Sequence, residues 1–213
     1  MQVYGFPLSP FVRKVLLVAA YKGIAVESVI SRPGAPSPEF LEASPFRKIP
    51  ALRDGDFTLA DSTAIATYMD ALHPEPAIFP AEARARGRAI WFEEFADTII
   101  VPAGAKIVFN RFVAPRVLGR PGDEAAAEQG MAEIAPMLDY LEGVVPAEGW
   151  LTGDTFSIGD IAVASVLRTM AYAMLSPDPD RHPATAAWFA RVGEQPCWRA
   201  VAEREAAAVA TLG

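Results

Sequence analysis

Hydrophobic and polar residues follow two different periods along the 213-residue chain, and the change of period divides it into two parts. In the first third, short alternating apolar runs predict strands, and longer runs with apolar residues on one face predict helices. In order, the predicted elements are a strand over residues 3–6, a helix over 10–21, a strand over 26–30, a short helix near 39–43, strands over 51–53 and 57–60, and a helix over 62–72. Asp54-Gly55 marks a hairpin between the last two strands, and residues 32–38 form a loop rich in proline and serine. The order β-α-β-α-β-β-α predicts an α/β domain.

The segment His73-Pro74-Glu75-Pro76 cannot continue a helix, because each proline lacks an N–H donor and restrains the residue before it. We therefore expect a first domain over residues 1–73, a linker over 74–80 and a second domain over 81–213. Beyond residue 81 the sequence is rich in alanine and periodic like a helix. It predicts an all-helical bundle of about five helices, with breaks at residues 115–122, 146–149, 177–183 and 196.

Composition and charge narrow the class of protein further. Apolar residues make up 52% of the chain, which is ample for a packed core. The net charge is −7, from 19 Lys and Arg against 26 Asp and Glu, and such a surface repels phosphate backbones. No apolar run approaches the roughly 18 residues of a membrane span, and the first residues lack the pattern of a secretory signal. A single cysteine fits a reducing compartment. We expect a soluble, cytoplasmic protein that binds neither nucleic acid nor membrane.

Ser9 follows the first predicted strand and precedes Pro10, which places it as the N-cap of the first helix with proline at the first helical position. Such a cap stabilises a helix by about 1 kcal/mol and needs no ligand. A second interpretation is also open. A helix start carries partial positive charge, and together with a hydroxyl donor it favours a bound thiolate over a thiol.

Ile49-Pro50 leads into a predicted strand, and proline is tolerated at the first residue of a strand. If the Ile49-Pro50 bond is cis, the Ile49 N–H and C=O point away from the sheet, and an extended peptide could pair with them. Arg47 and Lys48, just before this bond, could bind a carboxylate, although loop cations are usually only solvated.

Asp61-Ser62 begins the last helix of the first domain, again as a candidate N-cap. The free N–H groups at this helix start suit a carboxylate, and the Ser62 hydroxyl is a further donor. The Asp61 carboxylate would meet an amino group of the same ligand. One acceptor beside several donors matches an α-amino-acid head.

Four segments of the sequence, in order and at the right distances, resemble those of the cytosolic glutathione transferases. They are Tyr-Gly-Phe-Pro-Leu-Ser-Pro-Phe-Val-Arg at residues 4–13, Ser-Pro-Phe-Arg-Lys-Ile-Pro-Ala-Leu at 44–52, Asp-Ser-Thr-Ala-Ile at 61–65 and Phe-Ser-Ile-Gly-Asp-Ile-Ala at 156–162. The resemblance covers nearly the whole chain and is to the serine-type members, with the subclass unassigned. It implies a thioredoxin-like N-terminal domain, an all-helical C-terminal domain, a homodimer, and glutathione as co-substrate with no other cofactor.

The resemblance also implies roles for individual residues. Ser9 matches the residue that hydrogen-bonds the glutathione sulfur and keeps it as thiolate. The position of Ile49, before Pro50, matches the residue that pairs with the cysteinyl backbone. Asp61 and Ser62 match the pair that holds the γ-glutamyl head. Lys48 and Arg47 match positions that can reach the glycyl carboxylate. No cysteine lies near Ser9, which argues against deglutathionylation and dehydroascorbate reduction. The Ser-Ser-Cys signature of the maleylacetoacetate isomerases is also absent.

Other candidate residues have structural explanations. Ser157 and Asp160 form a capping box, and the apolar helix over 161–167 that follows should be buried. Cys197 is expected as a small buried hydrophobe rather than a nucleophile paired with His182. With only two histidines in the chain, far apart, a metal site is not expected.

Trp91, Phe95, Ile99 and Pro102 recur at helical spacing, and two phenylalanines follow, at positions 109 and 112. Such a stripe is usually core. In the glutathione transferase interpretation, part of it, together with residues 6–8, walls an apolar pocket for the electrophile.

The leading functional hypothesis is transfer of glutathione to small apolar electrophiles, with reduction of organic hydroperoxides as a close variant. The alternative is a non-catalytic glutathione-binding or scaffold protein on the same fold.

Overall fold

The computed structural model describes residues 1–31 and 36–210, so most of the predicted loop over 32–38 lies outside the described residues. The chain divides into two compact units. The first comprises Met1–Ile78 and Pro196–Ala210, and the second is Phe79–Gln195. Within the described ranges, no helix is both long and apolar enough to cross a membrane.

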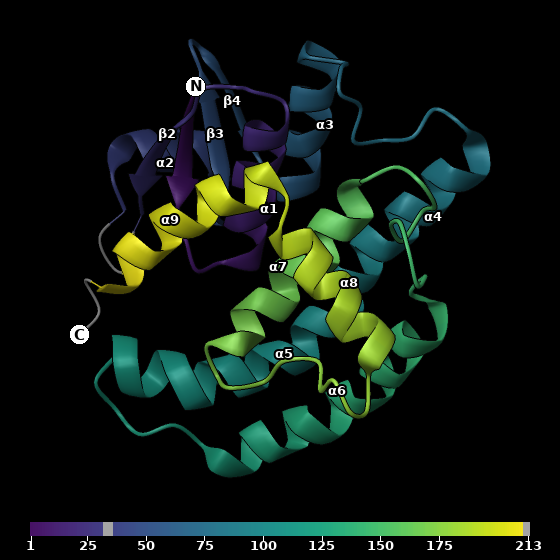
Figure 1. Cartoon of the computed structure of the whole chain (residues 1–213). Helices are drawn as coiled ribbons and strands as arrows, with labels where there is room; N and C mark the ends of the chain where they lie inside the picture. Colours follow the sequence, from purple (N-terminus) through teal and green to yellow (C-terminus); the bar gives the residue numbers. More distant parts are fainter. Residues whose placement is uncertain (32–35, 211–213) are drawn as a thin grey trace. The chain divides into compact units, whose positions relative to one another are not determined.

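The first unit is built on a four-stranded sheet in the order β2-β1-β3-β4 (Figure 1). The strands are β1 (Gln2–Gly5), β2 (Glu27–Ile30), β3 (Ala51–Asp54) and β4 (Phe57–Ala60), and the helices between and after them are α1 (Pro10–Tyr21), α2 (Pro38–Ala43) and α3 (Ser62–Leu72). β1 pairs with β2 in parallel, whereas β1–β3 and β3–β4 are antiparallel. The predicted β-α-β-α-β-β-α order is confirmed, and each element lies within two residues of its predicted bounds.

The two faces of the sheet bury different partners, as the alternation of a strand requires. Tyr4 and Ala51 form one cluster with Phe40 and Ala43 of α2. The neighbouring positions of β1 point the other way, toward α1. There, a Cβ at Gly5 would lie 2.4 Å from Val12 Cγ2, so only glycine permits this approach of α1 to β1.

The helix α9 (Pro196–Ala210), from the end of the chain, packs against α1 of the first unit. Arg13 Nε lies 2.6 Å from Glu205 Oε2, and both side chains are only 1% exposed. The sequence predicts domains over residues 1–73 and 81–213 with a linker over 74–80, which places α9 in the second domain. The contacts instead place α9 with the sheet, because it buries its surface against α1.

The C-terminal end of α1 is tied to the segment that follows α3. Lys22 Nζ donates to the carbonyls of His73 (2.7 Å) and Pro76 (2.8 Å), and it forms an ion pair with Asp70 at 2.5 Å. Asp70 also accepts a hydrogen bond from the Ile78 amide. The proline-rich segment predicted as a linker is thus fixed to the first unit through a buried lysine.

The second unit is helical. A continuous helical run comprises α4 (Ala83–Glu94), the π-helix η1 (Phe95–Ile100), α5 (Val101–Val108) and the π-helix η2 (Phe109–Val117), and it is followed by α6 (Glu124–Val144), α7 (Ile158–Ala171) and α8 (Pro183–Gly193). Counting α9 as well, five helical runs lie beyond residue 81 in the described part of the chain. The breaks between them fall in or beside the predicted segments.

The apolar stripe predicted as core is only partly buried. Phe95 is buried, but Trp91 is 46% exposed and Phe109 is 41% exposed. The core prediction is wrong for these two residues, and in α4 the buried face carries Ala89 and Phe92 instead of Trp91. In the π-helix η1 the hydrogen bonds run from residue i to i+5, so Ile100 rather than Ile99 shares the buried face with Phe95.

The centre of the second unit is α7, whose first ten residues are all buried, including the stretch 161–167 for which burial was predicted. Asp160, in its first turn, accepts four hydrogen bonds: from Leu151 N (2.9 Å), Trp188 Nε1 (3.0 Å), Ser157 N (3.1 Å) and Ser157 Oγ (3.1 Å). The predicted capping box is present. Through Trp188, Asp160 also connects α7 to α8.

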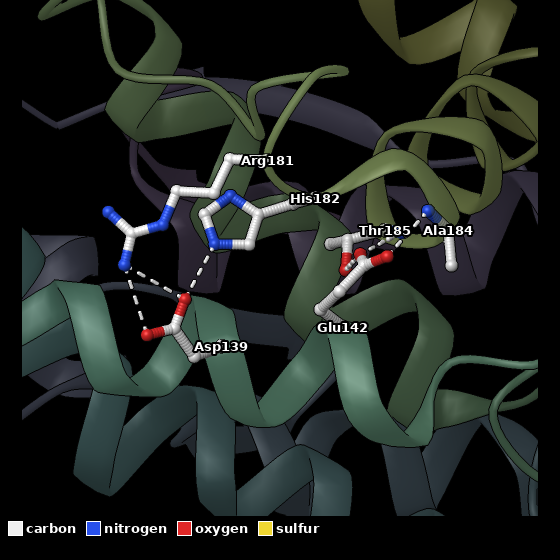
Figure 2. A network of polar contacts seen from close by, with 6 residues as sticks. All are labelled: Asp139, Glu142, Arg181, His182, Ala184 and Thr185. Carbon is white, nitrogen blue, oxygen red and sulfur yellow. Dashed lines mark hydrogen bonds and ion pairs between the residues drawn. The ribbon is translucent and has the colours of Figure 1, made fainter.

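The start of α8 is held by side chains of α6 rather than by its own N-cap residue (Figure 2). Glu142 accepts hydrogen bonds from the amides of Ala184 (3.0 Å) and Thr185 (2.9 Å) and from the Thr185 hydroxyl (2.8 Å). One turn earlier, Asp139 lies 3.0 Å from His182 Nε2. Glu142 therefore satisfies two backbone donors at this helix start, and Asp139 contacts the side chain of the N-cap residue His182.

Candidate functional site

The candidate residues of the first unit meet at one end of the sheet. The strand register sets Tyr4 opposite Ala51, and Ala51 opposite Ala60. Because β3 runs antiparallel to both neighbours, the end of β1, the start of β3 and the end of β4 lie at the same edge. Ser9 follows the end of β1, Pro50 precedes the start of β3, and Asp61 follows the end of β4. The three residues therefore come from segments that meet at this edge.

Ser9 caps α1 as predicted, with Pro10 at the first helical position. Its backbone is extended, and its Oγ accepts from the Val12 amide at 3.5 Å, which is long for a hydrogen bond. In the described part of the chain, the Ser9 hydroxyl makes no other hydrogen bond. Its proton is therefore available to an acceptor at the start of α1, where the helix dipole favours an anion.

The Ile49-Pro50 peptide bond is cis, as hypothesised from the sequence. Among residues 1–31 and 36–210, neither the amide nor the carbonyl of Ile49 has a hydrogen-bond partner. The Ile49 side chain packs against the cluster around Tyr4, which fixes its position. This backbone can pair with an extended peptide, as an edge strand does.

The loop before Ile49 is shaped by Ser44, a residue that the sequence analysis missed. Ser44 is fully buried, and its Oγ accepts from Lys48 N (2.9 Å) and donates to Lys48 O (2.7 Å). Arg47 has a φ of 57°, in the left-handed region. Both Arg47 and Lys48 are exposed, and in the described residues neither forms an ion pair.

Asp61 is the N-cap of α3, and its Oδ1 accepts from the amides of Thr63 (2.9 Å) and Ala64 (3.0 Å). Its φ of 84° is uncommon for a residue other than glycine and costs on the order of 1–3 kcal/mol. The second carboxylate oxygen points to no partner within the described ranges. Ser62 is buried, and its hydroxyl likewise makes no hydrogen bond there. An acceptor and a donor thus lie side by side at this helix start.

The other nucleophile candidate is not suited to chemistry. Burial raises the pKa of the Cys197 thiol to about 11, so that it is protonated near neutral pH. Within the described residues, no group of three or more His, Cys, Asp or Glu is arranged to hold a metal ion.

A sheet of this order, entered at β3 through a cis proline and joined to a helical unit, defines a thioredoxin-like domain followed by an all-helical domain. The glutathione S-transferase N-terminal domain family matches residues 3–77, and the corresponding C-terminal domain family matches residues 124–191. Glutathione S-transferase 3 of Zea mays is 32% identical over 211 residues, which cover 97% of this chain and 90% of that protein. The chain therefore belongs to the glutathione S-transferase family.

Solved structures agree with this assignment. A glutathione S-transferase of Rhodospirillum rubrum superposes with a TM-score of 0.86 at 26% identity, covering 94% of this chain and 90% of the other. Glutathione S-transferase I, solved with lactoylglutathione bound, superposes with a TM-score of 0.82 at 25% identity, covering 95% of this chain and 98% of the other.

Proposed function

We propose that the chain transfers glutathione to small apolar electrophiles, with Ser9 stabilising the thiolate that attacks the electrophilic carbon. Homologues named glutathione S-transferase along nearly the full length of the chain support the activity. The observation that carries the mechanism is the meeting of Ser9, Ile49 and Asp61 at one sheet edge, each with a donor or acceptor that no described residue uses.

In this proposal each part of glutathione meets a matching group. The sulfur accepts a hydrogen bond from the Ser9 hydroxyl at the start of α1, which favours the thiolate. The cysteinyl backbone pairs with the N–H and C=O of Ile49, before the cis Pro50. Asp61 receives the amino group of the γ-glutamyl head.

Three further groups complete the proposed tripeptide site. The Ser62 hydroxyl and the amides at the start of α3 bind the carboxylate of the γ-glutamyl head. Lys48 and Arg47 bind the glycyl carboxylate through their exposed charges.

The reaction needs no further cofactor in this mechanism. The thiolate donates its electron pair to the electrophilic carbon, a carbon–sulfur bond forms, and the leaving group departs with its electrons. The protein contributes thiolate stabilisation and proximity. Reduction of an organic hydroperoxide would begin with the same thiolate attacking the peroxide oxygen.

Substitution of Ser9 by alanine tests the role of its hydroxyl. We expect Ser9→Ala to raise the pKa of the bound glutathione thiol, followed by the ultraviolet absorbance of the thiolate, and to lower kcat with 1-chloro-2,4-dinitrobenzene. The matched control is Ser37→Ala, which removes a second Ser-Pro N-cap in the same unit, at the start of α2. Each variant should lose about 1 kcal/mol of stability. If Ser9→Ala behaves like Ser37→Ala in all three measurements, Ser9 is only a cap.

The proposed head-binding site has a test that preserves the helix cap. Asn is as good an N-cap as Asp, so Asp61→Asn should keep α3 stable while removing the negative charge. We expect calorimetry to show weaker glutathione binding to Asp61→Asn with an unchanged free energy of unfolding. Equal affinity for the two proteins would refute the assignment of Asp61 to the amino group.

Measurements of binding and turnover also distinguish the transferase activity from the alternative function, that of a non-catalytic glutathione-binding or scaffold protein. If wild type binds glutathione but turns over none of a panel of aromatic halides, enones and hydroperoxides, the scaffold function holds.

We also propose that the chain acts in the cytoplasm as a homodimer in detoxification, from the family relationship. Sedimentation equilibrium tests the assembly, since the dimer would have twice the chain mass of 22.9 kDa.

A further inference from the structure

A buried ion pair joins the last helix of the chain to the helix that begins at Ser9. Arg13 Nε lies 2.6 Å from Glu205 Oε2, and both side chains are buried. Glu205 belongs to α9, which packs against α1 within the first unit (Figure 1). Buried charges are screened much less than surface charges, so this pair acts on neighbouring groups over a longer distance.

Arg13 lies one turn after Ser9 on the same side of α1. The Arg13 amide donates to the Ser9 carbonyl at 2.9 Å, so the two residues stand at positions i and i+4 of the helix. Side chains at this spacing are neighbours, and they lean back toward the N-terminus of a helix. We therefore place the Arg13 guanidinium on the order of 10 Å from a sulfur atom bound at the Ser9 hydroxyl.

The other charged groups around the start of α1 leave an excess of buried positive charge. Lys14 is as buried as Arg13, and its Nζ lies 3.5 Å from the Thr63 hydroxyl at the start of α3. β1 has no charged residue. The remaining charges of α9 and the carboxylate that begins α3 are exposed: Arg199, Glu203, Arg204 and Asp61. Among the described residues of α9 and of the first turns of α1 and α3, two buried cations thus face one buried carboxylate, that of Glu205.

The charge of Glu205 opposes every other influence on a thiol bound at Ser9. The two cations, the start of α1 and the Ser9 hydroxyl all favour the thiolate and lower the pKa of the thiol. A thiolate with a very low pKa is a weak nucleophile, because nucleophilicity falls as the pKa falls, and the best attacking thiol has a pKa near the ambient pH. A carboxylate here therefore keeps the thiolate reactive.

We propose that Glu205 tunes the acidity of the bound glutathione thiol by neutralising the buried charge of Arg13. The inference rests on the proposed glutathione site at Ser9 and extends that site to the last helix of the chain. An arginine keeps its proton in a protein, so without Glu205 the whole charge of Arg13 acts on the thiolate. A unit charge on the order of 10 Å away, at an effective dielectric constant of about 20, changes a pKa by about one.

Glu205→Gln tests this role, because glutamine can still accept the hydrogen bond from Arg13 Nε but carries no charge. We expect the ultraviolet absorbance of the bound thiolate to give a pKa about one lower than in wild type. Above that pKa, kcat with 1-chloro-2,4-dinitrobenzene should be about threefold lower, since the thiolate is less basic. Sucrose in the buffer favours the folded state if the variant is too unstable without it.

The matched control is Asp70→Asn, which removes the carboxylate partner of another buried cation in the first unit. Asp70 pairs with Lys22 at the opposite end of α1, and the 12 residues of this helix separate that pair from Ser9 by about 18 Å. Asp70→Asn should lose stability as Glu205→Gln does, but it should leave the pKa of the bound thiol and the high-pH rate unchanged. A loss of stability alone therefore does not reproduce the expected result.

A double variant tests whether the effect passes through Arg13. Arg13→Met combined with Glu205→Leu removes both charges together and replaces a buried ion pair by apolar side chains, which proteins often tolerate. We expect the pKa of its bound thiol to return close to the wild-type value. A pKa as low as that of Glu205→Gln would show that the charge of Arg13 is not the cause and would overturn the proposal.

Ser9→Ala, measured in parallel, separates failure of this inference from failure of the proposed site. If wild type binds no glutathione, or if Ser9→Ala leaves the pKa of the bound thiol unchanged, the site at Ser9 is wrong and the inference falls with it. If Ser9→Ala raises that pKa while Glu205→Gln changes it no more than Asp70→Asn does, the role of Glu205 alone is overturned.

Discussion

Replacement of Asp160 by alanine should destabilise the chain without changing how it binds glutathione. The carboxylate accepts four hydrogen bonds in the core of the second unit, and three of the donors cannot turn elsewhere: the amides of Leu151 and Ser157 and the indole N–H of Trp188. Each buried donor left without a partner costs about 1–3 kcal/mol. Burial of the charged carboxylate is itself unfavourable, since it raises the pKa of Asp160 despite the hydrogen bonds that the carboxylate accepts.

The expected net loss is therefore about 3–5 kcal/mol, below the sum of three stranded donors, because water can enter the space left by the carboxylate. With a denaturant slope of about 2 kcal/mol per molar, the urea midpoint would fall by about 2 M. Asp160→Asn keeps one acceptor oxygen and should lose less. Asp154→Ala, in the exposed loop nearby, should be close to neutral.

The assay is urea unfolding followed by both circular dichroism and tryptophan fluorescence, so that coincident transitions justify a single free energy. Calorimetry with glutathione is then carried out where every variant is folded. A loss of less than about 1 kcal/mol for Asp160→Ala would contradict this role of the carboxylate, since that is no more than one ordinary hydrogen bond. Loss of glutathione affinity in the folded variant would refute the purely structural role.

Three further predictions concern buried or titrating groups. Glu205→Ala should cost about 3 kcal/mol because it removes a carboxylate that pairs with the buried Arg13 charge. Arg13→Met combined with Glu205→Leu should recover most of that loss, and additive losses in a double-mutant cycle would contradict the pairing. Burial raises the pKa of Cys197 from 9.0 to about 11. The contribution of this thiol to stability is therefore constant below pH 9.0 and is lost as the pH rises toward 11. In urea unfolding, the free energy of Cys197→Ala should not show this decrease with pH. Burial opposes ionisation of Glu142, but the hydrogen bonds that it accepts at the start of α8 hold its pKa below 4.5. The stability that Glu142 contributes should therefore be present above pH 4.5 and be lost as the pH falls further. Urea unfolding of Glu142→Gln should not show that loss.

The local features of this protein were determined by the sequence itself. Ser9-Pro10 and Asp61-Ser62 begin helices, Asp54-Gly55 joins β3 and β4, and the Ser157 capping box begins α7. Each of these depends on contacts within a few residues, so the residue types and their spacing suffice to predict them. The glutathione transferase family could also be recognised from such segments.

Tertiary structure decided which residues that are far apart along the chain lie close together in space. The strand register brings Ser9, Ile49 and Asp61 to one sheet edge, and α9 returns to α1 to pair Arg13 with Glu205, 192 positions away. Helix type likewise decided that Ile100 rather than Ile99 lies on the buried face of η1 with Phe95. Register, helix packing and helix type depend on the total surface buried by distant segments, and no short stretch of sequence contains that quantity.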